Sequence, residues 1–227
     1  MPLLSQFDIA AIVCFAGAWA LYATIIERTP HGRNGLNARM NKFREVWVRR
    51  MLDRDARMTD MQIMSALQNG TAFFASTTLL SIGGALTLLR SSEEVLTVVS
   101  LLPFSVPTTR GLWELKTIGL VLIFIYAFFK FAWSYRLFNY VSILFGAMPP
   151  HSEKGLPETE AHIMRTTRLF QSAGKHFNRG QRAFFFALGY LGWFVGPAVL
   201  IATTLAIVIV MWRRQFDSDS YRAMLES

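Results

Sequence analysis

Two cations and an amide interrupt an otherwise apolar segment near the middle of the chain. The stretch KFAWSYRLFNY, residues 130–140, places Lys130, Arg136 and Asn139 at the end of an apolar run. Ionisable residues at membrane depth are costly to bury and commonly belong to ligand or ion sites. Their long side chains can also reach the headgroup layer and merely mark the end of a span. The residues therefore indicate either a contact site for an anionic ligand or lipid, or a cytoplasmic helix boundary.

The length of this helix keeps both interpretations open. A hydrocarbon core of ~30 Å takes about 20 helical residues, so a span that enters near residue 117 leaves near Arg136. Apolar sequence nevertheless continues to Met148. We therefore expect a span over residues 117–136 with a helical extension to about residue 148. That extension either projects into the cytosol or bends at Asn139 along the membrane surface.

Residue patterns of known catalytic chemistry do not occur in the sequence. The four histidines include no HxxxH or HExxH pair, which are the ligand spacings of di-iron and zinc-protease sites. The GxxxxGK[ST] phosphate loop and the GxSxG nucleophile elbow are also missing. We predict no catalytic residue, no metal site and no cofactor, so the protein is not expected to be an enzyme.

Composition indicates that these residues sit in a membrane protein. Of 227 residues, 52% are hydrophobic and 17% are charged, whereas about 25% are charged in an average globular domain. Long apolar windows with few charges are typical of transmembrane helices. The fold class that follows is an all-α polytopic membrane protein, with four transmembrane helices plus amphipathic cytoplasmic helices in a single membrane domain, residues 1–227. The spans are expected over residues 9–26, 72–89, 117–136 and 184–212.

The first apolar segment is expected to be a retained span. A cleaved secretory signal has a basic region before its apolar core. The residues before Asp8 contain no Lys or Arg, so we expect this segment to stay in the membrane.

The fourth apolar segment contains helix-breaking and small residues. Gly192 and Gly196 form a GxxxG pattern that permits close helix packing, and Pro197 follows directly. At 29 residues the segment is about 43 Å long as a single helix, more than the bilayer needs. We expect one span that is kinked or tilted at Pro197.

The connections between the spans carry helical patterns of their own. Apolar residues recur at spacings of three and four through residues 36–52, which predicts an amphipathic helix either in the headgroup layer or packed on the rest of the protein. A second amphipathic helix is expected over residues 156–182. The segment before Pro103 predicts a short surface helix beginning near residue 91. The stripe of the first helix consists of Leu36, Met40, Phe43, Trp47 and Met51.

Basic residues are unevenly distributed between the connections. Residues 27–70 contain nine Lys and Arg, residues 149–183 contain six, and residues 90–117 contain three. Basic residues favour the cytoplasmic face, so the loops 27–70 and 149–183 are predicted to be cytoplasmic. With four spans both termini are then periplasmic. The net charge of +8 is explained by this distribution, and nucleic acid is not expected as a partner.

Three blocks of the sequence resemble a known family. They are WVRRMLDRDARMTDMQIMSALQNGTAFFAST, AFFKFAWSYRLFNY and FNRGQRAFFFALGYLGWFVGP, and together they are similar to the bacterial integral membrane proteins of domain of unknown function 599. The resemblance implies a multi-span inner-membrane protein without an established activity. It also marks where a site could lie, because the blocks include Lys130, Arg136, Arg54, Arg57, Asp60, Asn178 and Arg182.

Three functions are compatible with this sequence. The first is a non-catalytic scaffold, assembly factor or accessory subunit, which binds anionic membrane lipids or a membrane-protein partner, including a second copy of itself, through its basic cytoplasmic loops. The second is a small transporter or channel that uses the second and third spans, whose Ser, Thr and Gly residues between Asn69 and Gly84 could line a polar path. A lipid-modifying membrane enzyme is the third.

Overall fold

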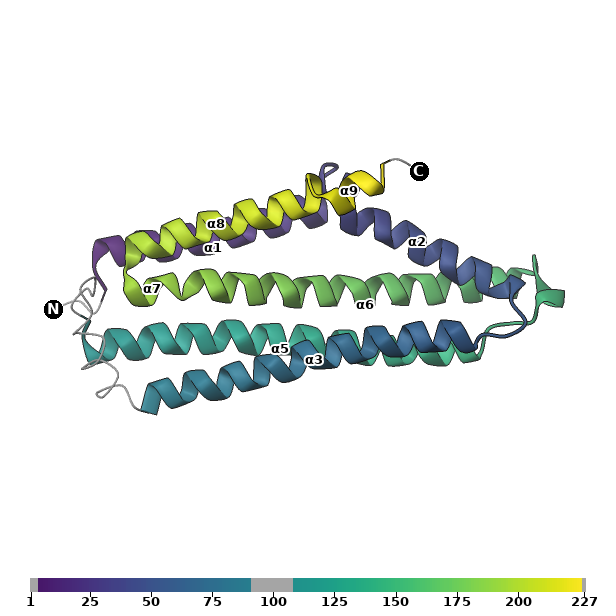
Figure 1. Ribbon diagram of the computed structural model, residues 1–227, viewed down its shortest axis with the longest axis horizontal. Helices are drawn as coiled ribbons and strands as arrows, with labels where there is room; N and C mark the ends of the chain where they lie inside the picture. Colours follow the sequence, from purple (N-terminus) through teal and green to yellow (C-terminus); the bar gives the residue numbers. More distant parts are fainter. Residues whose placement is uncertain (1–3, 91–107, 226–227) are drawn as a thin grey trace. The chain divides into compact units, whose positions relative to one another are not determined.

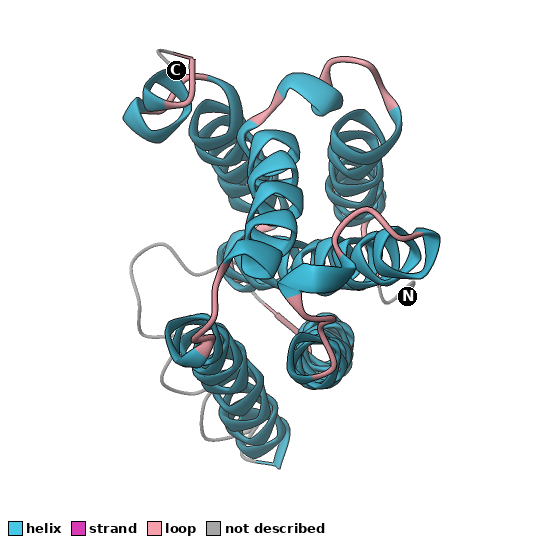
Figure 2. Ribbon diagram, turned by 90° about the vertical axis from the view of Figure 1, so that its right-hand side faces the viewer, coloured by secondary structure: helices cyan, strands magenta, loops and turns pink. Residues whose placement is uncertain are grey.

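The computed structural model of the protein describes residues 4–90 and 108–225, and every regular element in these ranges is a helix (Figure 2). Within these ranges four helices are long and apolar enough to cross a membrane, which confirms the predicted fold class. The short helix expected between residues 91 and 103 lies outside the described residues. The elements, labelled in Figure 1, are α1 (Gln6–Arg28), η1 (Gly32–Asn34), α2 (Leu36–Arg50), η2 (Met51–Asp53), α3 (Met58–Arg90), α5 (Arg110–Gly146), η3 (His151–Glu153), α6 (Pro157–Tyr190), α7 (Gly192–Val195), α8 (Pro197–Phe216) and α9 (Asp219–Ala223).

The helices form two compact units, each with its own hydrophobic core. Unit 1 comprises Met1–Leu36, Thr78–Tyr126 and Arg182–Ser227, and unit 2 comprises Asn37–Thr77 and Ala127–Gln181. The long helices α3, α5 and α6 each contribute one part to unit 1 and another to unit 2. The single membrane domain inferred from the sequence stays a prediction.

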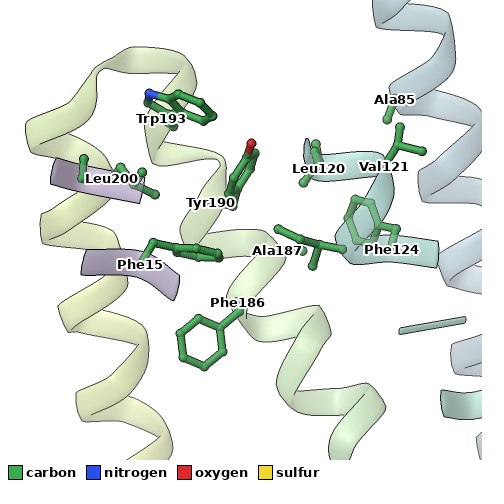
Figure 3. Close-up of a cluster of buried hydrophobic side chains, with 12 residues drawn as sticks. Phe15, Ala85, Leu120, Val121, Phe124, Phe186, Ala187, Tyr190, Trp193 and Leu200 are labelled. Carbon is green, nitrogen blue, oxygen red and sulfur yellow. The ribbon is translucent and has the colours of Figure 1, made fainter. Parts of the chain in front are cut away.

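The core of unit 1 is built around aromatic rings from α1 and α6 (Figure 3). Phe15 meets Phe186 and Tyr190 edge-on, with ring centroids 5.6 Å and 5.4 Å apart. Trp19 stacks on Phe186 at 5.1 Å. The α5 backbone approaches closely at Gly119, where a Cβ would stand 2.0 Å from the Tyr190 hydroxyl. The end of α6 is therefore an interior helix of this unit, packed against α1 and α5.

The segment expected to be a single fourth span is instead a hairpin. Helix α7 ends at Val195, and the extended backbone of Gly196 (φ 168°, ψ 164°) leads to Pro197 at the start of α8. The Thr203 hydroxyl donates a 2.6 Å hydrogen bond to the carbonyl oxygen of Gly189. A Cβ on Gly192 would stand 2.4 Å from that same hydroxyl. The prediction of one kinked rod over residues 184–212 is therefore wrong, because the chain reverses at Gly196 and the glycines let the two arms touch.

This hairpin changes the topology of the chain. Helices α1 and α8 lie side by side (Figure 1), with Asp8 bonded to Trp193 just before α8 and the Tyr22 hydroxyl bonded to the Met211 carbonyl near its end. The two helices therefore run in the same direction, and the start of α1 and the end of α8 lie at opposite ends of unit 1. This parallel direction does not fit the predicted placement of both termini on one face, which counted residues 184–212 as a single span.

Unit 2 is a helical bundle around a second core. Phe170 from α6 packs between Trp47 of α2 and Phe145 of α5, with ring centroids 5.2 Å and 6.0 Å away. Helix α5 passes through Asn139 without interruption, so the alternative of a bend at this residue is wrong. With 37 residues, α5 is about 55 Å long.

The apolar stripe expected on α2 is divided between the core and the surface. Met51, in η2 just beyond α2, is buried in the core of unit 2, and Trp47 packs against that core, whereas Met40 and Phe43 are 37% and 46% exposed. Part of the stripe therefore packs on the protein itself. The location of the exposed part in the headgroup layer stays a prediction.

Candidate functional site

A cluster of exposed arginines lies at the end of unit 1 where α1 and α8 terminate. Arg28 closes α1, Arg33 lies in the following η1 turn, and Arg213 and Arg214 are in the last turn of α8. All four are exposed. Arg28, Arg33 and Arg213 form no ion pair with any residue in the ranges 4–90 and 108–225. We call these four residues the basic rim.

Stacked aromatic rings hold the two sides of the basic rim together. The imidazole of His31 lies parallel to the Trp212 indole, with 5.3 Å between centroids and 14° between planes, and also contacts Phe216 at 4.4 Å. Gly35 brings the backbone against Gln215, because a Cβ there would stand 2.4 Å from Nε2. The connection after α1 is thus packed tightly on the end of α8, which fixes the arginines of both segments at one end of unit 1.

A buried ion pair lies near the basic rim and joins α1 to α6. The Arg182 guanidinium donates to the carboxylate of Glu27, and the two side chains are only 8% and 18% exposed. Arg182 was a candidate from the sequence, and its place here indicates a structural role. Glu27 largely compensates the charge of Arg182, whereas the arginines of the basic rim are exposed at the protein surface.

The candidates in the α2–α3 connection form a network inside unit 2. The fully buried Asp60 carboxylate accepts hydrogen bonds through Oδ1 from the Trp47 indole N–H at 2.5 Å and from the Arg54 guanidinium. Arg57 donates two 2.8 Å hydrogen bonds to the carbonyl oxygens of Met148 and Pro149. Asp60 and Arg57 therefore connect the start of α3 to neighbouring elements, so both charged side chains have a structural role.

The candidates on α5 and α6 occupy separate environments. Arg136 donates a 2.7 Å hydrogen bond through Nε to the hydroxyl of Tyr140, one turn further along α5. Asn139 accepts a 2.8 Å hydrogen bond from Gln68 of α3. Lys130 and Asn178 are half-buried on α5 and α6. The predicted site residues therefore lie in several separate local environments. Arg54 and Asp60 contact each other directly.

Ion pairs outside the apolar segments shift the pKa values of their members. The Lys154 ammonium, 2.5 Å from Asp53, lowers the pKa of that carboxyl. Glu160 lies 2.9 Å from Arg49 and raises the pKa of this guanidinium. These pairs connect η2 with the region after η3, and α2 with α6, and both lie within unit 2.

Sequence reasoning missed the basic rim because its members are distant in the chain. Arg28 and Arg213 are 185 residues apart, and only the parallel packing of α1 and α8 brings their ends together. The excess of arginine after Trp212 was visible as a signal, but the four-span topology placed it on the opposite face from Arg28.

The fold defines a class, that of polytopic helical membrane proteins. In the part of the chain that the structure describes, no group of three or more His, Cys, Asp or Glu side chains could hold a metal ion. The model of the DUF599 family, described as proteins of unknown function, matches residues 10–220, and the chain belongs to that family. No curated protein and no solved structure matches the chain.

Proposed function

We propose that the protein is a non-catalytic scaffold of a bacterial inner membrane that binds acidic phospholipid headgroups on its basic rim. The observation that carries this proposal is the set of three exposed arginines, Arg28, Arg33 and Arg213, that form no ion pair with the described residues. An arginine fork can hold a phosphate through two parallel hydrogen bonds.

Electrostatics favours this ligand at this position. A Lys or Arg side chain close to an anionic membrane surface gains about 1 kcal/mol. The rim lies at the ends of the apolar helices α1 and α8, and their terminal arginines would therefore sit near the headgroups. Trp212 adds an aromatic side chain of the type enriched at membrane interfaces.

The same distribution supports an orientation for the protein. Arg28, Arg33, Arg213 and Arg214 all lie at one end of unit 1, and basic residues favour the cytoplasmic face. We place this end and the C-terminus in the cytoplasm and the N-terminus in the periplasm. This arrangement also removes a conflict in the four-span topology, which put the basic C-terminal segment on the periplasmic face.

Lipid binding at the rim can be tested by replacing Arg28, Arg33 and Arg213 with Gln. The wild-type protein, extracted in mild detergent from membranes containing phosphatidylglycerol, is expected to retain this lipid in native mass spectra. The triple variant is expected to lose most of it. The control is Arg110→Gln, at the opposite end of unit 1, where Arg110 is paired with Glu114. Equal lipid retention by the wild type and the triple variant would overturn the proposal.

Transport is less well supported by the side chains of α3. The hydroxyls of Thr71 and Thr77 donate to the carbonyl oxygens of Leu67 and Phe73, one turn earlier in the same helix. Such bonds leave the hydroxyl protons unavailable to a permeating solute. A membrane-protein partner or a second copy of the chain stays a prediction.

A further inference from the structure

A pocket of about 210 Å³ lies between α2 and α6 within unit 2. Its α2 wall is formed by Glu45 and Arg49, which are one helical turn apart. Its α6 wall is formed by residues that share one helix face, namely Ile163, Met164, Thr167, Arg168 and Gln171. The pocket is therefore lined by two apolar side chains together with several hydrogen-bond donors.

One of these donors is buried without a partner. Thr167 is 6% exposed, and its hydroxyl forms no hydrogen bond within the described residues. The neighbouring Thr166 shows the usual alternative, since its hydroxyl donates to the His162 carbonyl at 2.8 Å. A buried hydroxyl without a hydrogen-bond partner destabilises the folded protein, because the interactions that it made with water are not replaced. A ligand that accepts this proton would recover part of that cost.

A second donor supplies positive charge. Arg168 is exposed and forms no ion pair or hydrogen bond with residues 4–90 or 108–225. Arg49 across the pocket is already compensated, because it contacts Glu160 at 2.9 Å and Glu45 at 3.4 Å. The lining carboxylate of Glu45 is thus engaged by Arg49, and the charge of Arg168 is left for a ligand.

A third group contributes amide hydrogens. Gln171 donates through Nε2 to the backbone carbonyl of Asn41 at 3.1 Å, which fixes its amide at the pocket wall. A primary amide carries two N–H groups, so one remains for another acceptor. A hydroxyl, a guanidinium and an amide N–H on consecutive turns of one helix match a small oxyanion.

We propose that this pocket binds a phosphate group, through the Arg168 guanidinium and the Thr167 hydroxyl. The phosphate belongs either to a free anion or to a phospholipid headgroup, since both present the same oxygen acceptors. This site is separate from the basic rim, because it lies in unit 2 and shares no residue with it.

The proposal is tested by titrating the purified full-length protein in a neutral detergent with two probes. Inorganic phosphate represents the free anion, and dihexanoyl phosphatidylglycerol represents the headgroup. We expect Arg168→Gln to weaken binding by about tenfold or more and Thr167→Val by a smaller factor, as measured by isothermal titration calorimetry. Binding of phosphate alone identifies a free-anion site, and binding of the lipid probe without phosphate identifies a headgroup site.

The matched control is Arg165→Gln, an exposed arginine on the same helix that does not line the pocket. It is expected to bind both probes like the wild type. Equal weakening by Arg165→Gln and Arg168→Gln would reveal unspecific charge attraction and overturn the site, as would a wild-type protein that binds neither probe.

The unliganded Thr167→Val variant provides a second measurement. Its Tm should equal or exceed that of the wild type, since valine removes an unsatisfied hydroxyl without changing the volume much. A lower Tm combined with unchanged phosphate affinity would assign the hydroxyl to structure and overturn its role in binding.

Discussion

The indole N–H of Trp193 donates a 2.8 Å hydrogen bond to the carboxylate of Asp8. Both residues are almost completely buried, with 2% and 6% of their surface exposed. The bond joins the start of α1 to the turn that precedes α8. The Ser5 hydroxyl caps α1 by accepting a hydrogen bond from the Asp8 backbone N–H, and the Asp8 carboxylate accepts in return from the Ser5 backbone N–H and hydroxyl. Because α1 and α8 begin at the same end of unit 1, they must cross a membrane in the same direction.

This parallel arrangement predicts that the two termini are on opposite sides of the membrane. Single cysteines are introduced at Gln6 and Ser220, both exposed, after Cys14 is replaced by serine. A membrane-impermeant maleimide added to intact cells should label the cysteine at position 6 and not the one at position 220. Inside-out vesicles should give the reverse result.

A third cysteine at Asn34 provides the control for this experiment. Asn34 lies in η1, at the same end of unit 1 as the end of α8, so it should be labelled together with position 220 in every preparation. Labelling of positions 6 and 220 from the same side would contradict the hairpin between α6 and α8.

The sequence predicts the helices of this fold better than their connections. Hydropathy and helical periodicity depend only on neighbouring residues, so α1, α3 and the 37-residue α5 were recognisable. The reversal at Gly196 was not, because a glycine followed by proline is compatible with either a kink or a turn. The deciding contact is the hydrogen bond from Thr203 to Gly189, which is tertiary and has no local signal.

The candidate sites also differ in how far the sequence could predict them. The Arg54–Asp60 pair spans six residues and could be suspected from local spacing, and it proves to be a structural contact with Trp47. The basic rim depends on packing between α1 and α8, and the α2–α6 pocket depends on packing of helices more than a hundred residues apart. Neither was accessible without the tertiary structure.

The close approach of α5 and α6 makes Gly119 sensitive to substitution. A Cβ there would stand 2.0 Å from the Tyr190 hydroxyl and 2.9 Å from its Cζ atom. Gly119→Ala should therefore lower the free energy of unfolding by about 1–3 kcal/mol through overpacking. Unfolding by sodium dodecyl sulfate in mixed micelles, followed by circular dichroism, measures the change.

Gly84→Ala is the matched control for Gly119→Ala. A Cβ at Gly84 meets no atom within 4 Å, and alanine has the higher helix propensity. This variant should be as stable as the wild type or slightly more stable. Similar destabilisation by both alanines would show that the α5–α6 contact is not as tight as described.

The buried Glu27–Arg182 pair should be strongly coupled. Removing one partner leaves the other charge buried, so Glu27→Gln and Arg182→Gln should each cost about 3–5 kcal/mol. The double variant that combines Glu27→Gln with Arg182→Gln should be much less destabilised than the sum of the two single variants. The same detergent unfolding assay measures this double-mutant cycle, and additive effects would mean that the pair contributes no coupling.

The Asp53–Lys154 pair predicts a specific dependence of stability on pH. Lys154 lowers the pKa of Asp53 in the folded protein, so the pair stabilises the fold above the ordinary aspartate pKa of about 3.9. This contribution is lost as pH falls through the lower, folded-state pKa. The wild type should therefore have a slightly higher Tm than Asp53→Asn at pH 6, and the difference should vanish in acid.

Both side chains are about half exposed, so high salt should also reduce the difference at pH 6. A Tm difference that persists equally in acid and in high salt would show that Asp53 acts through something other than this ion pair.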